Sequence, residues 1–265
     1  LNNVASVGDA IFASGFIYTS SGTIDRYLVK YNLATGNKVW EASFADPIGS
    51  RDGAYESMVV TSDGGLALTG VRDAEPGSLE GFKSYGNPSS GSAFVDYFSA
   101  EQLASDNAPQ GSAWSTELPG ANSGKGIREL PNGGFVVAAL GAEEGPGHAF
   151  RLSASGEVNW VNQYPEHGEI TDLSLLSENG TVTGIALVGH YRPSGGGIDG
   201  SVTRLNLSGE IIWHKGVGDP VGGIAQFAGL GSGNPNLIFD ECWGIQGTSD
   251  GGMILACGTG IEGCG

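Results

Sequence analysis

Two short β-hairpin motifs alternate along the chain, and this repeat constrains the fold more than any other feature of the sequence. The first motif is a strand, a turn that ends in glycine, and a second strand that carries tryptophan. It occurs at Tyr27–Trp40, Phe150–Trp160 and Val202–Trp213, with the glycine four positions before the tryptophan each time. A looser copy runs from Phe94 to Trp114 with a longer connection. Internal repeats of this length decide the architecture of a chain.

The second motif is an Asp-Gly or Asn-Gly turn followed by an apolar strand that ends in glycine. Clear copies lie at Thr61–Gly70, Leu130–Gly141 and Thr248–Gly258, and looser copies lie at Glu178–Gly189 and Val7–Gly15. Asp-Gly and Asn-Gly readily adopt the positive φ that tight hairpin turns require. Each copy of either motif therefore predicts a β-hairpin.

The tryptophans of the first motif are spaced 74, 46 and 53 residues apart, close to the roughly 40–50 residues of one propeller blade plus insertions. The sequence therefore predicts an all-β fold, a β-propeller of four-stranded antiparallel blades. One such sheet cannot bury both faces, whereas blades stacked around an axis can. We interpret four tryptophans as residues that pack between neighbouring blades: Trp40, Trp114, Trp160 and Trp213.

The hairpins are expected to belong to a single domain over residues 1–265. A half-blade at 1–22 precedes repeat units at 23–73, 91–142, 147–191 and 200–262. This arrangement gives five hairpins of the second kind and four of the first. We therefore expect at least five blades, the last of them incomplete, in a protein that continues beyond this chain.

The stretch Asn32-Leu-Ala-Thr-Gly-Asn-Lys-Val-Trp40 resembles the repeat of quinoprotein-type propellers, whose blades carry an A-x-D-x-x-T-G-x-x-x-W signature. The Asp-Gly-Gly turns resemble those of secreted bacterial and algal propellers. The resemblance covers most of the chain and implies a fold more than an activity. A quinone-dependent dehydrogenase would also need ligands for its cofactor and for calcium, and we place none in this sequence.

Charge and hydropathy exclude several classes of partner. The formal net charge is −17, and the 12 basic residues form no run. A nucleic acid partner needs clustered Lys and Arg, so we expect neither nucleic acid nor an anionic membrane as partner. No apolar run approaches the ~20 residues of a membrane-spanning helix. The acidity suits a soluble protein outside the cell or at its surface.

The cysteines and two glycosylation sequons bear on whether the protein lies outside the cell. Cys242, Cys257 and Cys264 lie close to one another in sequence, and their spacing does not match a zinc site. One disulfide is expected, and Cys242–Cys257 and Cys257–Cys264 are the competing pairs. Asn179 and Asn206 begin Asn-x-Ser/Thr sequons at predicted turns, where glycans could be attached.

Long connections are predicted at one face of the propeller, at Asp73–Ser92, Tyr191–Gly200 and His214–Phe239. Elaborated loops on a rigid scaffold are where binding usually resides. Acidic and arginine side chains are expected on the same side: Asp52, Glu169, Asp240, Glu241, Arg51, Arg72 and Arg192. The carboxylates could bind calcium or a polyhydroxylated ligand, with the arginines gripping an anionic sugar, or they could simply cap turns and hydrate the rim.

No catalytic constellation stands out. His148, His167, His190 and His214 lack metal-ligand spacing and are expected at the surface or at blade edges, and no G-x-S-x-G elbow is present. The sequence therefore predicts that the chain is not an enzyme, and that it needs no cofactor except possible calcium. Ser99–Gln102 has the form of a capping box and predicts one short helix.

The leading hypothesis is an extracellular structural or adhesive module that binds a protein partner, or copies of itself, through the long-loop face. One alternative is a carbohydrate-binding propeller, for which Phe82, Tyr85 and Tyr191 are candidate aromatic contacts. The other alternative is an enzyme, either a quinoprotein or a propeller that acts on polysaccharides, because catalytic residues can be scattered in sequence.

Overall fold

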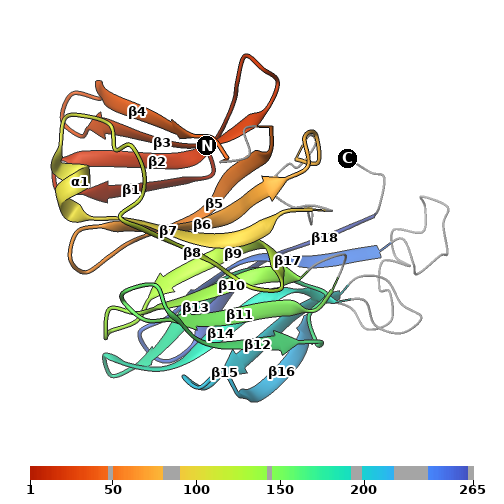
Figure 1. The fold of residues 1–265 in the computed structure, drawn as a ribbon. Coiled ribbons are helices and arrows are strands. Elements are labelled where there is room, and N and C mark those ends of the chain that lie inside the picture. The colour runs from red at the N-terminus through yellow and green to blue at the C-terminus, as the bar shows by residue number, and fades with distance from the viewer. Residues whose placement is uncertain (47–49, 80–89, 142–144, 192–198, 218–237, 262–265) are drawn as a thin grey trace. The chain divides into compact units, whose positions relative to one another are not determined.

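The computed structural model describes residues 1–46, 50–79, 90–141, 145–191, 199–217 and 238–261 (Figure 1). Within these residues the fold is all-β, with strands β1 to β18 and one short helix. The strands form four four-stranded antiparallel sheets and one two-stranded sheet. In each sheet, strands that are neighbours in sequence lie side by side, as in the blades of a β-propeller.

The first two sheets have the following strands. The first sheet consists of β1 (Asn3–Val7), β2 (Ala10–Tyr18), β3 (Ile24–Asn32) and β4 (Lys38–Phe44). The second consists of β5 (Asp52–Val60), β6 (Leu66–Ala74), β7 (Ser92–Phe98) and β8 (Trp114–Glu117). The helix α1 (Ala100–Ala104) lies in the connection between β7 and β8.

The other three sheets follow the same plan. The third consists of β9 (Ala121–Glu129), β10 (Phe135–Gly141), β11 (Gly147–Leu152) and β12 (Val158–Tyr164). The fourth consists of β13 (Glu169–Glu178), β14 (Thr181–Tyr191), β15 (Asp199–Leu205) and β16 (Ile211–Val217). The fifth consists of β17 (Ile238–Gly247) and β18 (Met253–Ile261).

The described strands confirm the predicted hairpins. Five hairpins of the Asp-Gly or Asn-Gly kind and four of the tryptophan kind are present. Gly64 and Gly133, each the first glycine of a Gly-Gly turn, have φ values of 85° and 79°, which side chains other than glycine rarely tolerate. Each complete sheet consists of one Asp-Gly or Asn-Gly hairpin and the tryptophan hairpin that follows it in sequence. The predicted repeat units begin with the tryptophan hairpin instead, so the sheets are offset from these units by one hairpin.

The chain divides into two compact units. Unit 1 contains Leu1–Glu144 and His148–Asn162, and unit 2 contains Gly145–Gly147 and Gln163–Gly265. In unit 1, one buried apolar cluster joins the first and second sheets and another joins the second and third. In unit 2, a third cluster joins the fourth and fifth sheets. The core of each unit therefore lies between the faces of successive sheets, as the hydrophobic effect demands of sheets with two apolar faces.

Three of the four tryptophans of the first motif contribute to these clusters. Trp40 is 6% exposed and packs against Phe12 with ring centroids 5.9 Å apart. Trp114 stacks on Tyr97, with ring centroids 5.4 Å apart and an interplanar angle of 17°. Trp213 is half-buried against the unit 2 cluster, and Trp160 is also half-buried.

The predicted capping box is present at helix α1. The Ser99 hydroxyl accepts a hydrogen bond from the Gln102 backbone N–H, and the Gln102 side chain accepts one from the Ser99 N–H. At the other end, Lys30 Nζ donates to the carbonyls of Leu103 at 2.9 Å and Ser105 at 3.1 Å. A cation near the C-terminal carbonyls of a helix stabilises it. These contacts fasten the helix to the first sheet.

Candidate functional site

The polar clusters of both units lie at one end of their sheets, which we call the connection end. At the opposite end the hairpins turn tightly, except for β7–β8, whose connection contains helix α1. At the connection end the first strand of each sheet begins and the second strand ends. In unit 1, Asp25, Asp52, Asp46 and Asp73 lie where β3 and β5 begin and where β4 and β6 end. Since the strands hold the backbone there, the side chains project from a rigid scaffold.

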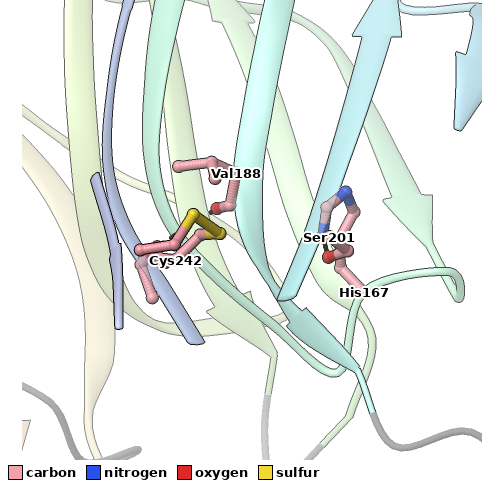
Figure 2. Close-up of a disulfide and its surroundings, with 6 residues drawn as sticks. His167, Val188, Ser201 and Cys242 are labelled. Atoms are coloured by element: carbon pink, nitrogen blue, oxygen red, sulfur yellow. Dashed lines mark hydrogen bonds between the residues drawn. A yellow bond between two sulfur atoms is a disulfide. The ribbon is translucent and has the colours of Figure 1, made fainter. Parts of the chain in front are cut away.

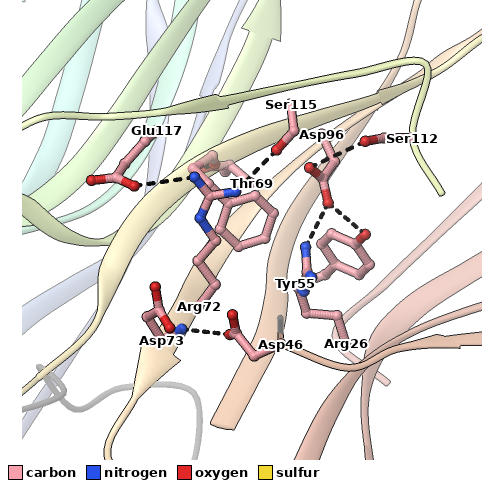
Figure 3. Close-up of polar contacts among 11 residues, drawn as sticks. Arg26, Asp46, Tyr55, Thr69, Arg72, Asp73, Asp96, Ser112, Ser115 and Glu117 are labelled. Atoms are coloured by element: carbon pink, nitrogen blue, oxygen red, sulfur yellow. Dashed lines mark hydrogen bonds and ion pairs between the residues drawn. The ribbon is translucent and has the colours of Figure 1, made fainter. Parts of the chain in front are cut away.

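In unit 1, Asp96 on β7 is the centre of a buried polar network (Figure 3). Its Oδ2 atom accepts hydrogen bonds from Arg26 Nη1 and from the Tyr55 hydroxyl, both at 2.8 Å. The exposed fractions of Arg26, Asp96 and Tyr55 are 8%, 3% and 0%. Burial, and then the Asp96 charge, raises the pKa of the Tyr55 phenol well above its usual value. The phenol therefore stays a hydrogen-bond donor to Asp96, whose other oxygen, Oδ1, accepts from Ser112 Oγ at 3.5 Å.

Three more aspartates surround this network at the connection end. Asp52 is satisfied, because its carboxylate accepts the backbone N–H groups of Ile24 and Gly77, each at 2.9 Å. Asp46 is 6% exposed; its Oδ2 atom accepts the Asp73 N–H at 2.6 Å, while its Oδ1 atom is buried without a hydrogen-bond partner. Asp25 is 8% exposed and forms no ion pair among the described residues.

Burial is the largest cause of a raised pKa at both Asp25 and Asp46. The charge of Arg26 lowers the pKa of Asp25, whereas Asp46 and Asp52 raise it. At Asp46 the Asp73 N–H lowers the pKa and the Asp73 carboxylate raises it, and the charges of Arg26 and Arg72 lower it further. Negative charge at this end is therefore costly to hold in the folded state.

The arginines predicted for the site pair with glutamates. Arg72 donates to Ser115 Oγ at 3.1 Å and to Glu117 Oε2 at 3.2 Å, and its guanidinium lies 5.5 Å from the Phe94 ring centre (Figure 3). Arg51 forms an ion pair with Glu75. Both pairs are partly solvent-exposed, so each contributes little stability. Arg192 lies outside the described residues.

In unit 2, histidines and hydroxyls form a chain of hydrogen bonds, part of which is drawn in Figure 2. Ser201 Oγ lies 2.6 Å from His167 Nδ1, and Thr203 Oγ1 lies 2.7 Å from His167 Nε2 and 2.8 Å from His214 Nδ1. A neutral imidazole donates at one nitrogen and accepts at the other, so this chain satisfies His167 without a charge. Tyr191 packs edge-on against His214, with ring centroids 5.8 Å apart.

Burial, followed by the neighbouring His214 and His190, lowers the pKa of His167 to about 3. Burial also lowers the pKa of His214. His167 therefore stays neutral at physiological pH. Since Ser201 and His167 are both 0% exposed, this serine–histidine pair is closed to a substrate from solvent and serves to hold the strands together.

The expectation of histidines at the surface or at blade edges was wrong for three of the four. His148, His167 and His190 are 3%, 0% and 8% exposed, and His214 is half-buried. His167 is buried because the β12–β13 connection folds it onto β15. Its partner there, Ser201, lies 34 residues further along the chain. No local pattern in the sequence signals such a contact.

The acidic residues predicted in unit 2 lie near the same end of their strands. Glu169 Oε2 lies 3.4 Å from His190 Nε2. Asp240 is 8% exposed, and burial raises the pKa of Glu241. Among the described residues, no group of three or more His, Cys, Asp or Glu side chains converges on a point where a metal ion could sit. Calcium binding by the predicted carboxylates stays a prediction.

The structure pairs Cys242 on β17 with Cys257 on β18 in a disulfide across one hairpin (Figure 2). Cys242 is fully buried and belongs to the unit 2 cluster, whereas Cys257 is exposed. The competing partner Cys264 lies outside the described residues. Because the two cysteines are direct partners in the strand register, the bond fastens β17 to β18.

The two sequons differ in how far their asparagines are engaged. Asn206 Oδ1 accepts the N–H groups of Ser208 and Glu210, both at 2.9 Å, so its side chain already stabilises the β15–β16 turn. Asn179 is exposed in the β13–β14 turn with a φ of 51°. Of the two, Asn179 is the more accessible acceptor for a glycan.

Comparison with known proteins gives a likeness of fold only. No family model matches the chain, and no curated protein matches it. Similar solved structures include a europium-containing methanol dehydrogenase (13% identity, TM-score 0.47), with 81% of this chain covering 41% of that one. A mutant NanB sialidase from Streptococcus pneumoniae is 12% identical, with coverages of 88% and 34% and a TM-score of 0.47. The β-propeller domain of the Trilobed protease from Pyrococcus furiosus is 11% identical, with coverages of 82% and 56% and a TM-score of 0.39.

These comparisons correct the prediction that the chain is not an enzyme. The similar structures include a dehydrogenase and a sialidase, so the absence of a catalytic motif was no ground for excluding activity. At this identity the likeness does not assign an activity to this chain either. The chain spans less than half the length of both enzymes.

Among the described residues, no helix has the length and apolar character needed to cross a bilayer. Two aromatic residues proposed for sugar contact, Phe82 and Tyr85, lie outside the described part of the chain.

Proposed function

We propose that this chain is an extracellular binding module that holds a protein partner at the connection end of its sheets, and that unit 1 supplies the charge for that contact. One observation carries the proposal. Asp25 and Asp46 are buried there, yet no ion pair reaches either carboxylate in the described part of the chain. The neighbouring arginines are engaged elsewhere, Arg26 with Asp96 and Arg72 with Glu117.

The chemistry of these carboxylates favours basic groups as ligands. A lysine or arginine side chain of a partner would donate charge-assisted hydrogen bonds to them and relieve the cost of their burial. Asp73 sits beside Asp46 in the left-handed region, with a φ of 58°, which is strained for a residue other than glycine. Backbone strain and buried carboxylates without an ion pair are features that proteins retain where a site needs them.

Placement outside the cell is supported by the Cys242–Cys257 disulfide, because such bonds persist in oxidising compartments and are rare in the cytosol. The net charge of −17 gives the whole molecule an attraction for basic partners at a distance. The connection end then supplies the specific contact.

The test uses a library of short lysine- and arginine-containing peptides at physiological salt. The chain is compared with the double variant Asp25→Asn, Asp46→Asn, which keeps the shape of both side chains. We expect the best-binding peptides to lose at least tenfold in affinity for the variant. The matched control is Asp9→Asn combined with Glu41→Gln, because both carboxylates are exposed and lie away from this end of unit 1.

Equal losses in the double variant and in the control would show that the net charge alone attracts the peptides, and the proposal would fail. A library without any binder that discriminates between the chain and the double variant would reject it as well.

A further inference from the structure

The outer strand of the third sheet, β12, presents an edge that differs from the outer edges of the other complete sheets. In these sheets the outer strands are β4, β8, β12 and β16, and among the described residues each pairs with one strand only (Figure 1). β12 lies between β11 and β13 in the chain, so the strands before and after it are both described. An outer edge of this kind presents backbone N–H and C=O groups to which a further strand can pair.

β12 lacks the residues that usually prevent an exposed edge from pairing with another chain. Such edges usually carry charged side chains or proline. β4 carries Lys38 and Glu41, β8 carries Glu117, and β16 carries Lys215. β12 reads Val-Asn-Trp-Val-Asn-Gln-Tyr and contains neither a charge nor proline. Of these four outer strands, β12 is therefore the one best suited to pair with a further strand.

The two faces of β12 differ in exposure. On one face, Trp160 is half-buried and Tyr164 is 2% exposed. On the other face, Val161 is 42% exposed, and Asn159 and Gln163 are exposed on either side of it. Because side chains alternate along a strand, these three residues form one row. The row consists of an apolar side chain between two neutral amides.

Charge favours this edge as the place where two copies of the chain meet. The formal net charge of the chain is −17, so two copies repel one another wherever their acidic surfaces approach. Like charges that face each other across an interface cost several kcal/mol. β12 contributes no charge to a contact, so the repulsion is weakest there.

The strand is also complementary to itself when two copies run antiparallel about Val161. Val161 then lies opposite Val161 of the second copy, and on both sides of this pair Asn159 lies opposite Gln163. An amide side chain both donates and accepts hydrogen bonds, so Asn and Gln can bond across the interface. Glu157, just before the strand, lies opposite Pro165, so no two carboxylates face each other.

We propose that the β12 edge binds a second copy of this chain, and that the two β12 strands pair antiparallel about Val161. The contact is isologous, because the same residues serve on both copies, and its two-fold axis closes the assembly as a dimer. The two third sheets become one continuous sheet across the axis. The contact uses none of the carboxylates that we propose for a basic partner at the connection end.

Sedimentation of the intact chain over a range of concentrations at physiological salt tests the dimer. We expect a monomer–dimer equilibrium whose Kd rises at least tenfold in Val161→Lys, because two ammonium groups then face each other at the axis. Ile212→Lys is the matched control, since Ile212 is 52% exposed on the outer strand β16. The control should leave the Kd unchanged, and thermal unfolding checks that both variants fold.

A second variant, Val161→Cys, tests the register by a gain of cross-linking. Directly opposed side chains in an antiparallel pair have Cβ atoms about 4.5–5.5 Å apart, close enough for the introduced thiols of two copies to form a disulfide. Under mild oxidation we expect at least tenfold faster formation of covalent dimer than in Ile212→Cys. The unsubstituted chain measures any contribution of Cys264.

Four results would overturn the inference. They are a chain that stays monomeric at about 100 µM, a dimer that Val161→Lys leaves intact, equal weakening by both lysine variants, and cross-linking of Val161→Cys at the rate of its control. The Asp25→Asn, Asp46→Asn variant should dimerise normally, so this proposal and the proposed function can fail separately. Loss of the dimer in that variant would place the contact at the connection end and reject the β12 edge.

Discussion

Asp96 in unit 1 and Thr203 in unit 2 stand at the same position of the repeat but organise opposite kinds of polar core. Asp96 lies opposite Leu68 and Thr203 lies opposite Leu187, in the third strand of their sheets. Asp96 is a carboxylate that binds Arg26 and Tyr55, whereas Thr203 is a hydroxyl between His167 and His214. The repeat therefore determines that this position is buried and leaves the chemistry that satisfies it free to vary.

The difference has consequences for stability. Removing one member of a buried ion pair leaves an uncompensated charge, whereas removing a hydroxyl between neutral imidazoles leaves only unpaired polar atoms. Conversely, the neutral network depends on histidines that must remain uncharged, so it is sensitive to acid. The two units should thus fail under different conditions.

The largest effect is expected for Asp96→Ala, which leaves Arg26 buried without a counter-charge. We expect a loss of about 3–5 kcal/mol in the free energy of unfolding, measured by urea denaturation. Thr203→Val at the equivalent position should lose about 1–3 kcal/mol. Equal losses would break the comparison. A double variant, Arg26→Met with Asp96→Leu, should recover much of the loss because neither charge is then buried.

Acid should act on unit 2 through His167. Its folded pKa of about 3 lies below the ordinary value of 6.5, so the unfolded state binds more protons between these pH values and stability falls as the pH is lowered. From pH 6.5 to pH 4 the expected loss is about 3 kcal/mol. His214, His190, Glu166 and Glu169 face the same cluster and shape the curve.

The matched variant for the acid effect is His167→Gln, whose amide can bind Ser201 and Thr203 but does not titrate. Urea denaturation at several pH values gives the free energy of unfolding as a function of pH. Below pH 6 the slope of this curve should be shallower for the variant, by an amount that corresponds to the uptake of close to one proton on unfolding. An unchanged slope would assign the acid sensitivity to other groups.

Within unit 2, loss of the Cys242–Cys257 disulfide should destabilise the two-stranded fifth sheet more than it destabilises the four-stranded fourth sheet. The bond closes a loop with a sequence separation of 15 residues. Replacing Cys242 and Cys257 with alanine should cost about 3 kcal/mol in the chain-entropy model. Hydrogen exchange checks the location: protection should fall first in β17 and β18, and a uniform loss across unit 2 would contradict the expectation.

The smallest effect, and one of opposite sign, is expected for Asp46→Asn. The pKa of Asp46 is raised by burial, so its charge costs stability above the folded pKa. The variant should gain no more than about 1 kcal/mol near pH 7, after allowance for solvent screening. The gain should vanish as the pH falls below about 3.8, where the unfolded carboxyl is protonated as well. A loss at pH 7 would show that the charge is satisfied and would weaken the proposed function.

Several elements were predictable because their causes are local. Gly64 and Gly133 adopt the positive φ that their turns need, and Ser99 and Gln102 form their capping box within four residues. The candidate site was only partly predictable. Asp52 was placed at the correct end of its strand, but its partners, the N–H groups of Ile24 and Gly77, lie 28 and 25 residues away.

The sequence by itself determined the hairpins, their number in the described residues and their alternation, because turn geometry and two-residue periodicity act over a few neighbouring positions. Only the tertiary structure decided which side chains satisfy the buried positions and which cysteines pair. His167 meets Ser201 and Arg26 meets Asp96 across 34 and 70 residues. Such contacts depend on how the sheets stack and on which strands the connections bring next to one another. The hydrophobic effect drives that stacking without specifying individual polar partners.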